Sequence, residues 1–518
     1  MPSLVQSVDW TALAPAAIPA AVALVVLVAD LFLPRARKQV LAWTTVGGLA
    51  LAGLTLIPLR AGRHATFCET GAGAGKGGCS YAADHFTLVI QVLVLGGALL
   101  TALLSVHSTE DELPAGEYWF LLLSSAAGGA LLPASRDLAT LIVALEVTTL
   151  PAFALVGLRR GDRMSSEAAL KFFLSSVTAT AVSLLGISFV YAATGTLHLA
   201  AVADALTHTP GQLGTLAKVG AALTLVGFAF KLAAAPFHFW VPDTYAGAPL
   251  PVAAYLSVVG KAAGFSGLIL VAVIAFRPYD DVWGPAFGVL AALTMTVGNV
   301  GALRQRPGVE RGAVRLLAWS SIGQAGYLLV PLAAAGSSGD PAHEIGTTVA
   351  YALMYGVVNL GAFAVAALVT RTAPAGRLAD YRGLYATRPL AALALAFFLL
   401  CLAGLPPGVI GLFAKVAVFS SAVGAQHGWL AVIMAVNVAI ALVYYLRWTA
   451  LLFAGRADAT GEVTGTALGE GAAAGAGPLS VAAAPVGLTA AIALTAVAAI
   501  VLSGAPQIVL RYAQGTLF

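Results

Sequence analysis

Residues Phe230–Lys261 read FKLAAAPFHFWVPDTYAGAPLPVAAYLSVVGK, and this stretch decides how the rest of the chain is interpreted. Lys231 ends a long apolar run and is followed five residues later by Pro236. Proline removes a backbone donor and clashes with the preceding turn, so a helix that carries Lys231 is predicted to be interrupted here. Lys261 lies within the next apolar run. The stretch therefore combines an interrupted apolar helix with two lysines in apolar surroundings.

The whole chain shares the apolar character of this stretch. Of its 518 residues, 59% are hydrophobic and only 10% are charged, whereas soluble proteins carry about 25% charged residues. Apolar runs longer than about 18 residues recur along the chain, and each can cross a hydrocarbon core about 30 Å thick as a helix. The predicted fold class is therefore an all-α polytopic membrane protein.

Fourteen candidate membrane spans can be placed along the chain. The first has no Lys or Arg before it and positive charges after it, which favours a transmembrane helix over a cleaved signal peptide. Residues 456–479 are rich in Gly, Ala and Thr and are predicted to form a flexible linker. The predicted spans cover residues 13–33, 40–59, 86–107, 118–134, 137–157, 167–193, 214–235, 250–275, 284–303, 316–335, 346–370, 390–422, 428–453 and 480–503.

The distribution of basic residues predicts how these spans are oriented. Cytoplasmic connections carry an excess of Lys and Arg, so the richer set marks the inner side and both termini are predicted to lie outside a bacterial cell membrane. No basic cluster stands apart from the helix ends, so nucleic acid is not expected as a partner. The richer set is Arg35, Arg37, Lys38, Arg159, Arg160, Arg163, Arg304, Arg306, Arg311, Arg315, Arg371, Arg377, Arg382, Arg388 and Arg456; the poorer set is Arg60, Arg63, Lys76, Arg136, Lys218, Arg277 and Arg511.

The three cysteines have different surroundings. Cys68 and Cys79 share one Gly-rich connection, which the predicted orientation places outside. A disulfide could persist in an oxidising compartment, and two unpaired loop thiols are the alternative. Cys401 lies in an apolar run and is interpreted as a small hydrophobic residue.

Four ionisable residues lie near the middle of predicted spans: Glu146 in the fifth, Lys231 in the seventh, Lys261 in the eighth and Lys415 in the twelfth. Each costs about 2.5–3.5 kcal/mol at the membrane centre, even on insertion scales. Structural ion pairs or snorkelling to an interface are the simple explanation, but apolar residues flank all three lysines on both sides. The functional interpretation is a proton relay, because a nearby carboxylate favours the charged lysine and an apolar setting favours the neutral one.

Three further residues near the ends of spans are candidates for the same site. Glu167 and Lys171 are spaced i,i+4 with the glutamate first, which is the favourable order for a helical ion pair. They either extend the relay on the cytoplasmic side or anchor the sixth span. His238, in the connection after the seventh span, either tunes the relay or is a structural loop histidine.

The twelfth span is predicted to be interrupted in the same way as the seventh. Pro406 and Pro407 precede Lys415 in the run AGLPPGVIG. Irregular backbone inside a bilayer is tolerated only where protein or water satisfies it, and a pair of such helices marks the ion path in transporters. Two accidental kinks are the alternative. The predicted divisions are an N-terminal three-helix segment (1–117), two inverted five-helix repeats (118–283 and 284–455), the linker (456–479) and a C-terminal helix (480–518).

Three segments resemble the antiporter-like family shared by membrane subunits of NADH–quinone oxidoreductase (complex I) and by multisubunit cation/proton antiporters. They are Phe230–Lys261, Trp319–Tyr327 (WSSIGQAGY) and Ala403–Lys415 (AGLPPGVIGLFAK). The first matches the family's run of lysine, Pro, His, Trp-x-Pro-Asp, Gly-Ala-Pro and a second lysine. The likeness extends over residues 120–450.

The resemblance implies a role for each buried charge. In this family a glutamate of the fifth helix pairs with a lysine of the seventh, which correspond to Glu146 and Lys231. A lysine of the eighth helix carries the path inward and a residue of the twelfth connects it to the outside, which correspond to Lys261 and Lys415. Glu167 and Lys171 resemble a further pair in the sixth helix of subunit N.

Within this family the chain most resembles subunit N. It stops after fourteen predicted spans, whereas subunit L is longer, and it has Lys415 where subunit M normally has glutamate. Two positions depart from the family pattern. In the run GLFAK, Leu412 separates a glycine and a phenylalanine that are more commonly adjacent in the family. Arg315 stands where lysine is usual, which leaves an ion role for residue 315 in doubt.

The resemblance implies a proton-translocating subunit with no cofactor or metal of its own. NAD, FMN, iron–sulfur clusters and quinone are expected on partner subunits, and neighbouring antiporter-like subunits and the lipid bilayer are the expected partners. The sequence has no CxxC cluster, no Rossmann or P-loop glycine pattern after a strand, and no paired histidines suited to haem. A subunit of a sodium/proton antiporter and a non-pumping structural scaffold are the alternatives.

Overall fold

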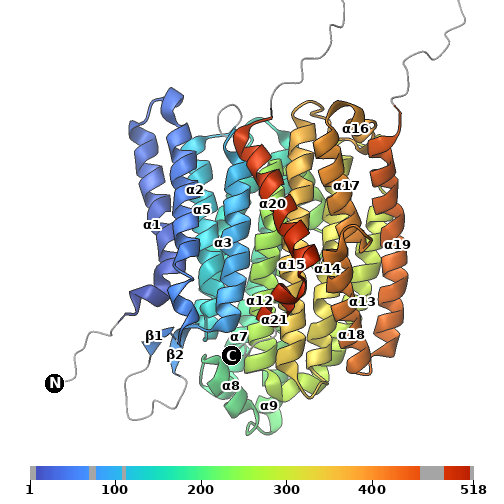
Figure 1. The fold of residues 1–518 in the computed structure, drawn as a ribbon. Helices are drawn as coiled ribbons and strands as arrows, with labels where there is room; N and C mark the ends of the chain where they lie inside the picture. Colours follow the sequence, from blue (N-terminus) through green and yellow to red (C-terminus); the bar gives the residue numbers. More distant parts are fainter. Residues whose placement is uncertain (1–7, 63, 69–77, 108–112, 456–483, 514–518) are drawn as a thin grey trace, which may run out of the picture.

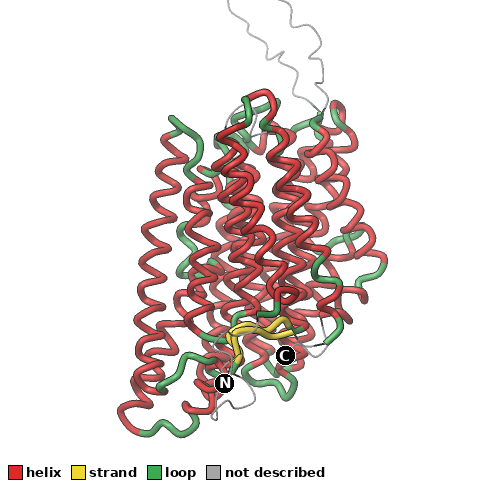
Figure 2. Tube along the Cα trace, turned by 90° about the vertical axis from the view of Figure 1, so that its left-hand side faces the viewer, coloured by secondary structure: helices red, strands yellow, loops and turns green. Residues whose placement is uncertain are grey.

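The computed structural model describes residues 8–62, 64–68, 78–107, 113–455 and 484–513 as a bundle of long, roughly parallel helices (Figure 1). A two-stranded hairpin, β1 (His64–Cys68) and β2 (Cys79–Ala83), lies at one end of the bundle. Figure 2 shows the same arrangement from the side. We call this end the hairpin end and the opposite end the far end. The predicted linker, residues 456–479, lies outside the described residues.

The all-α membrane fold is confirmed. Twelve helices among the described residues are long and apolar enough to cross a membrane. Each overlaps one predicted span; the remaining two spans correspond to α5 and to the pair α17 and α18, so the count of fourteen stays a prediction. The main helices are α1 (Trp10–Phe32), α2 (Gln39–Leu54), α3 (His85–Ser105), α5 (Ala115–Leu131), α6 (Leu138–Val156), α7 (Arg163–Thr194), α9 (Gly211–Leu232), α11 (Leu250–Tyr255), α12 (Lys261–Ile269), α13 (Asp280–Leu303), α14 (Gly312–Ala335), α15 (Pro341–Thr370), α17 (Pro389–Ala403), α18 (Val409–Gly424), α19 (Gly428–Phe453) and α20 (Val486–Gly504).

Four short α-helices accompany these long ones in the described part of the chain, besides several single-turn 3-10 helices. The four are α8 (Leu199–Leu206), α10 (Val241–Gly247), α16 (Leu384–Thr387) and α21 (Gln507–Ala513). The sequence did not predict α8, which lies between the sixth and seventh spans at the hairpin end (Figure 1). Its apolar residues Leu199, Val202 and Leu206 are buried, so it closes that end of the bundle.

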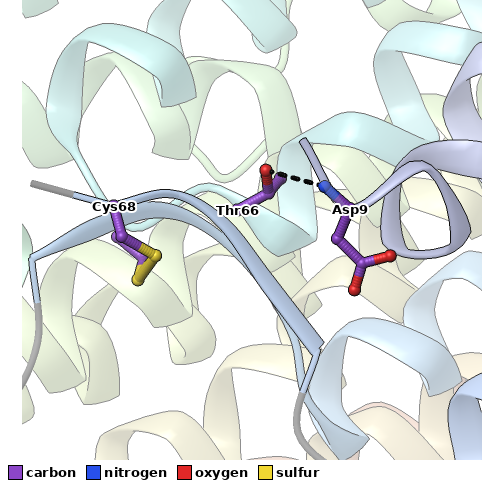
Figure 3. Close-up of a disulfide and its surroundings, with 4 residues drawn as sticks. Asp9, Thr66 and Cys68 are labelled. Atoms are coloured by element: carbon purple, nitrogen blue, oxygen red, sulfur yellow. Dashed lines mark hydrogen bonds between the residues drawn. A yellow bond between two sulfur atoms is a disulfide. The ribbon is translucent and has the colours of Figure 1, made fainter. Parts of the chain in front are cut away.

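The hairpin is fastened to the bundle by hydrogen bonds and closed by a disulfide. Cys68 and Cys79 face each other in the ladder and form a disulfide, which answers the question that the sequence left open (Figure 3). The backbone N–H of Asp9 donates to Thr66 Oγ1 at 3.2 Å. The Tyr81 hydroxyl donates to the Ala12 carbonyl at 2.9 Å. The hairpin therefore holds the start of α1 in place.

Both predicted helix interruptions are present. After α9 ends at Leu232, Ala233 adopts a left-handed conformation with φ of 66°, and the next helix begins only at Val241. After α17 ends at Ala403, Gly404 has φ of 85°. An alanine there would be strained, because left-handed backbone favours glycine. Whether the two breaks belong to an inverted repeat stays a prediction.

The eighth predicted span is a continuous but irregular helix. Between α11 and α12 lies a π-helical segment, Leu256–Gly260, and a second one, Leu270–Ala275, follows α12. π-helical turns are frequent at functional sites. The first π-helical segment ends directly before Lys261. The helix is therefore wider than an α-helix in the turn that precedes this lysine.

The helices pack around one large apolar core, which extends from Ala16 to Val509, and a small second cluster lies beneath the hairpin. Small residues let α13 and α14 approach closely, since a Cβ added to Gly298 would overlap the backbone of Gly323. This contact fixes α14 inside the bundle, where its whole central section is buried. The polar side chains of α14 therefore face other helices rather than lipid.

Candidate functional site

Glu146 of α6 and Lys231 of α9 meet inside the bundle, as the sequence predicts. The Lys231 Nζ lies 3.5 Å from Glu146 Oε1. It donates to Ser176 Oγ at 2.6 Å and to Thr149 Oγ1 at 3.4 Å. Thr180 donates to Glu146 Oε1 at 2.7 Å. The two charges thus share a set of hydroxyl groups, and the lysine is nearer to a hydroxyl than to the carboxylate.

The burial of the three lysines argues against snorkelling. Lys231, Lys261 and Lys415 are 5%, 3% and 6% exposed. Lysine that snorkels keeps its charged head in water and so remains exposed at its tip. These side chains end inside the protein, where a charge must be paired or hydrogen-bonded.

Lys261 is held by the interrupted end of α9. Its Nζ donates to the carbonyl of Leu232 at 3.2 Å, and Leu232 is the last residue of that helix. The final carbonyls of a helix lack partners within the helix and carry partial negative charge. The helix break therefore leaves the Leu232 carbonyl free to accept the hydrogen bond from Lys261 Nζ. Leu232 directly follows Lys231 in the chain.

Lys415 is held in the same way by the interrupted end of α17. Its Nζ donates to the carbonyls of Leu402 and Ala403 at 2.8 and 2.7 Å. It also lies 5.7 Å from the centre of the Tyr327 ring. Among the described residues, Lys261 and Lys415 have no carboxylate within ion-pair distance. Each is bound mainly by the dipoles of a broken helix, which a neutral amine can also satisfy.

A line of neutral polar side chains leads from Lys261 towards Lys415. Ser257 lies one turn before Lys261 and accepts from Asn359 at 2.7 Å. The Tyr355 hydroxyl donates to Ser321 Oγ at 3.0 Å. The Tyr351 hydroxyl donates to Gln324, which lies about one turn after Ser321 on α14. The line thus crosses from the π-helical segment to α15 and α14.

A small cavity joins this line to the second interrupted helix. It has a volume of about 20 Å³ and is lined by Gln324, Tyr351, Tyr355 and Lys415 among other residues. A cavity of at least about 10–15 Å³ with polar walls can hold one water molecule. One water here would bridge the lysine to the two tyrosines or the glutamine.

The sequence did not single out these tyrosines, the serine or the asparagine as site residues. Ser321 and Gln324 lie within WSSIGQAGY. This motif supported the family resemblance, but none of its residues was assigned a role. Tyr351 and Tyr355 are spaced i,i+4, so both lie on one face of α15. That spacing was the available signal, but it is equally typical of ordinary core packing.

Glu167 and Lys171 form an ion pair near the start of α7, at the far end of the bundle. The pair lies outside the line of buried polar side chains. Their charged atoms are 2.8 Å apart, and the side chains are about half exposed. Lys171 also pairs with Asp243 of α10 at 3.0 Å, and Arg315 pairs with the same carboxylate at 2.8 Å. Arg315 therefore does take part in an ion pair. Burial raises the pKa of Asp243, but the hydrogen bond and charge of Lys171 and the charge of Arg315 hold it below its usual value.

Aromatic rings separate this ion cluster from Lys231. Phe172 directly follows Lys171 and stacks on Trp240 at 4.4 Å between ring centres. Phe172 also meets Phe153 edge-to-face at 4.7 Å, and the Phe153 ring lies 5.8 Å from Lys231 Nζ. Stacked rings exclude water, so the cluster and the buried lysine are neighbours without a direct polar contact.

His238 lies in the interruption between α9 and α10, as predicted. Its ring is 5.7 Å from that of Trp319, and its Nδ1 is buried without a hydrogen-bond partner among the described residues. Burial lowers the pKa of His238, and the nearby backbone of Pro236 only partly offsets this. The neutral ring is therefore favoured. In the described part of the chain, no three His, Cys, Asp or Glu side chains group as metal ligands would.

The chain is similar along its whole length to proteins of one family. The family model described as "NADH:quinone oxidoreductase/Mrp antiporter, TM" matches residues 135–441. A "NADH-quinone oxidoreductase subunit N 2" from Streptomyces griseus subsp. griseus is 70% identical over 517 residues, which is 100% of this chain and 95% of that protein.

Two solved structures have the same fold. A chain of respiratory complex I from Thermus thermophilus with bound aureothin is 31% identical and superimposes with a TM-score of 0.73, over 97% of this chain and 100% of that chain. A chain of the Mrp complex from Dietzia sp. superimposes with a TM-score of 0.78 at 22% identity, over 97% of this chain and 96% of that chain. The second likeness concerns the fold alone.

Proposed function

Because the chain belongs to the NADH:quinone oxidoreductase/Mrp antiporter transmembrane family, we propose that it is the proton-translocating subunit N of a bacterial NADH–quinone oxidoreductase. The observation that carries this function is the contact between half-buried Glu146 and buried Lys231, together with Lys261 and Lys415, whose Nζ atoms bind the last carbonyls of two interrupted helices. Charges in such positions are costly and are retained where they serve ion transfer.

The proposed path begins at Lys231 and ends beyond Lys415. With Glu146 at 3.5 Å, Lys231 is favoured in its charged form; if Glu146 moves away, desolvation favours the neutral amine and the proton leaves. The proton then passes by Lys261 and the polar side chains of α14 and α15 to Lys415. Each receiving lysine is already hydrogen-bonded by backbone carbonyls, so it can hold a proton without an ion partner.

Energy for this transfer would come from partner subunits. NADH oxidation and quinone reduction are assigned to other chains of the complex, and neighbouring antiporter-like subunits would transmit the resulting electrostatic or conformational change. The far end, where the described members of the richer set of basic residues lie, is assigned to the cytoplasm. The hairpin end with its disulfide is assigned to the outside, where disulfides persist. Protons would then reach Lys231 from the cytoplasmic side through Glu146.

The divisions of the chain follow from the same proposal. Residues 118–283 and 284–455 would form two inverted repeats, each with one interrupted helix. Residues 1–117 and 480–518 would support them, and 456–479 would link the last helix. The breaks after Leu232 and Ala403 support this division, because each ends a helix at a carbonyl that receives a buried lysine.

The proposed function predicts that NADH-driven proton uptake depends on this chain. Inverted membrane vesicles from cells that lack the chain are expected to lose NADH-driven proton uptake, because the complex lacks one path. Expression of the unmodified chain should restore it. Proton uptake is followed with a pH-sensitive dye and NADH oxidation by absorbance in the same sample.

The two alternatives give different results in this experiment. If the vesicles exchange sodium for protons without NADH, and NADH oxidation does not depend on the chain, it is an antiporter subunit. If the chain is needed for assembly but neutralised lysines never change proton uptake per assembled complex, it is a structural scaffold.

A further inference from the structure

We propose that Glu344 is a further proton-binding group of this path, placed between Lys415 and the hairpin end. It would take the proton that Lys415 releases and pass it to water outside the bundle. This inference rests on the proposed function. The sequence did not single out Glu344, because the predicted eleventh span began two residues after it.

Glu344 is buried although it lies near the end of a helix. It belongs to the first turn of α15, at the hairpin end, and its exposure is 7%. Its carboxyl group is hydrogen-bonded to the Ser421 hydroxyl of α18. Asp340 already caps α15 by accepting from the backbone N–H of His343 at 3.1 Å. Glu344 is therefore not needed as the cap of its helix.

Two helices, α15 and α18, lead from the region of Lys415 to this carboxyl. On α15, Glu344 lies seven residues before Tyr351, so the two share one face of the helix. On α18, Ser421 follows Lys415 by six residues, a rise of about 9 Å at 1.5 Å per residue. Tyr351 and Lys415 line the same small cavity. The carboxyl thus lies where both helices lead from that cavity towards the hairpin end.

The surroundings of Glu344 allow it to exist in both protonation states. Among the described residues, no Lys, Arg or His side chain lies within ion-pair distance of it. Burial without a cation disfavours the carboxylate, so the neutral acid is accessible. The Ser421 hydroxyl can donate to a carboxylate or accept from the acid, so this contact persists in either state. Among the described residues, the charged group that acts on Glu344 is Asp340, one turn earlier on the same helix.

The transfer balances without any other reactant. The ammonium of Lys415 loses one proton and becomes an amine, and the carboxylate of Glu344 gains that proton and becomes the acid. Water in the cavity beside Lys415 and the Thr348 hydroxyl, one turn from Glu344 on α15, would bridge the gap. The acid then releases its proton to water at the hairpin end, which restores the carboxylate.

The test compares Glu344→Gln with two controls in the assembled complex. Glutamine keeps the shape and the hydrogen bond to Ser421 but cannot take up a proton. We expect NADH-driven proton uptake per assembled complex to fall at least about tenfold, because a positioned proton-transfer group commonly contributes about a hundredfold or more. Glu344→Asp, which retains a titratable group, should recover part of it. Asp340→Asn, at the exposed cap of the same helix, should leave proton uptake per complex unchanged.

A chemical measurement on the unmodified complex gives an independent result. Apolar carbodiimides add to protonated carboxyl groups in apolar surroundings, so the peptide that contains Glu344 should carry the adduct in mass spectra. Normal proton uptake in Glu344→Gln, or no adduct at Glu344 if that variant fails to assemble, would overturn this inference. Lys231→Ala measured in parallel separates the two proposals, because normal proton uptake in that variant would instead overturn the proposed function.

Discussion

Replacing Glu146 with glutamine is expected to reduce NADH-driven proton uptake at least about tenfold, because a positioned proton-transfer group commonly contributes a hundredfold or more. The carboxylate is the only ion partner of Lys231 among the described residues. Glutamine has the same shape and can still accept from Thr180. Without the negative charge, the buried lysine is favoured in its neutral form, so the path no longer loads its first proton. The measurement is dye-monitored proton uptake in inverted vesicles, normalised to assembled complex.

The matched control is Glu167→Gln. Glu167 also pairs with a lysine at 2.8 Å, but both side chains are about half exposed. Exposed ion pairs are screened by solvent and contribute little, so proton uptake should change little. Equal loss in both variants would mean that the buried contact has no special role.

Replacing Lys415 with arginine is expected to stop proton uptake while the charge at this position remains. Arginine offers hydrogen-bond donors for the carbonyls of Leu402 and Ala403, but it cannot release its proton in a protein. A structural role needs only the charge and the donors. A relay needs a group that alternates between two protonation states. The expected loss is again at least about tenfold.

Two controls accompany this variant. Lys218→Arg makes the same substitution at an exposed position of α9 and should leave proton uptake unchanged. The amount of assembled complex is measured by native gel, because arginine is larger and Lys415 lies against Tyr327 and Gly404. Normal proton uptake by an assembled Lys415→Arg complex would mean that this lysine only closes the broken helix.

The parts of the site that the sequence predicted are those with a strong local signal. A lysine within an apolar run and a proline shortly before or after it are visible without any knowledge of packing. The two interrupted helices were predicted in this way, one from Lys231 with Pro236 and the other from Lys415 with Pro406 and Pro407. The specific pairing of Glu146 with Lys231 came from the family resemblance, and the 3.5 Å contact agrees with it.

The parts that the sequence did not predict depend on which helices become neighbours. Tyr351, Tyr355 and Ser321 are common residues of helix interfaces, and only their contacts in the folded bundle distinguish them. The acceptors of Lys261 and Lys415 are backbone carbonyls, which no residue type reveals. Glu344 was missed because charges at helix ends are ordinary, whereas its burial comes from α18 packing against the first turn of α15.

The most direct test of the proposed relay is NADH-driven proton uptake in inverted vesicles that carry Lys231→Ala, with NADH oxidation recorded in the same sample and both normalised to assembled complex. Lys231 is buried and lies where the carboxylate, the hydroxyl groups and the interrupted helix meet. The relay predicts that proton uptake is abolished although the complex assembles. Full proton uptake together with normal quinone reduction would contradict it.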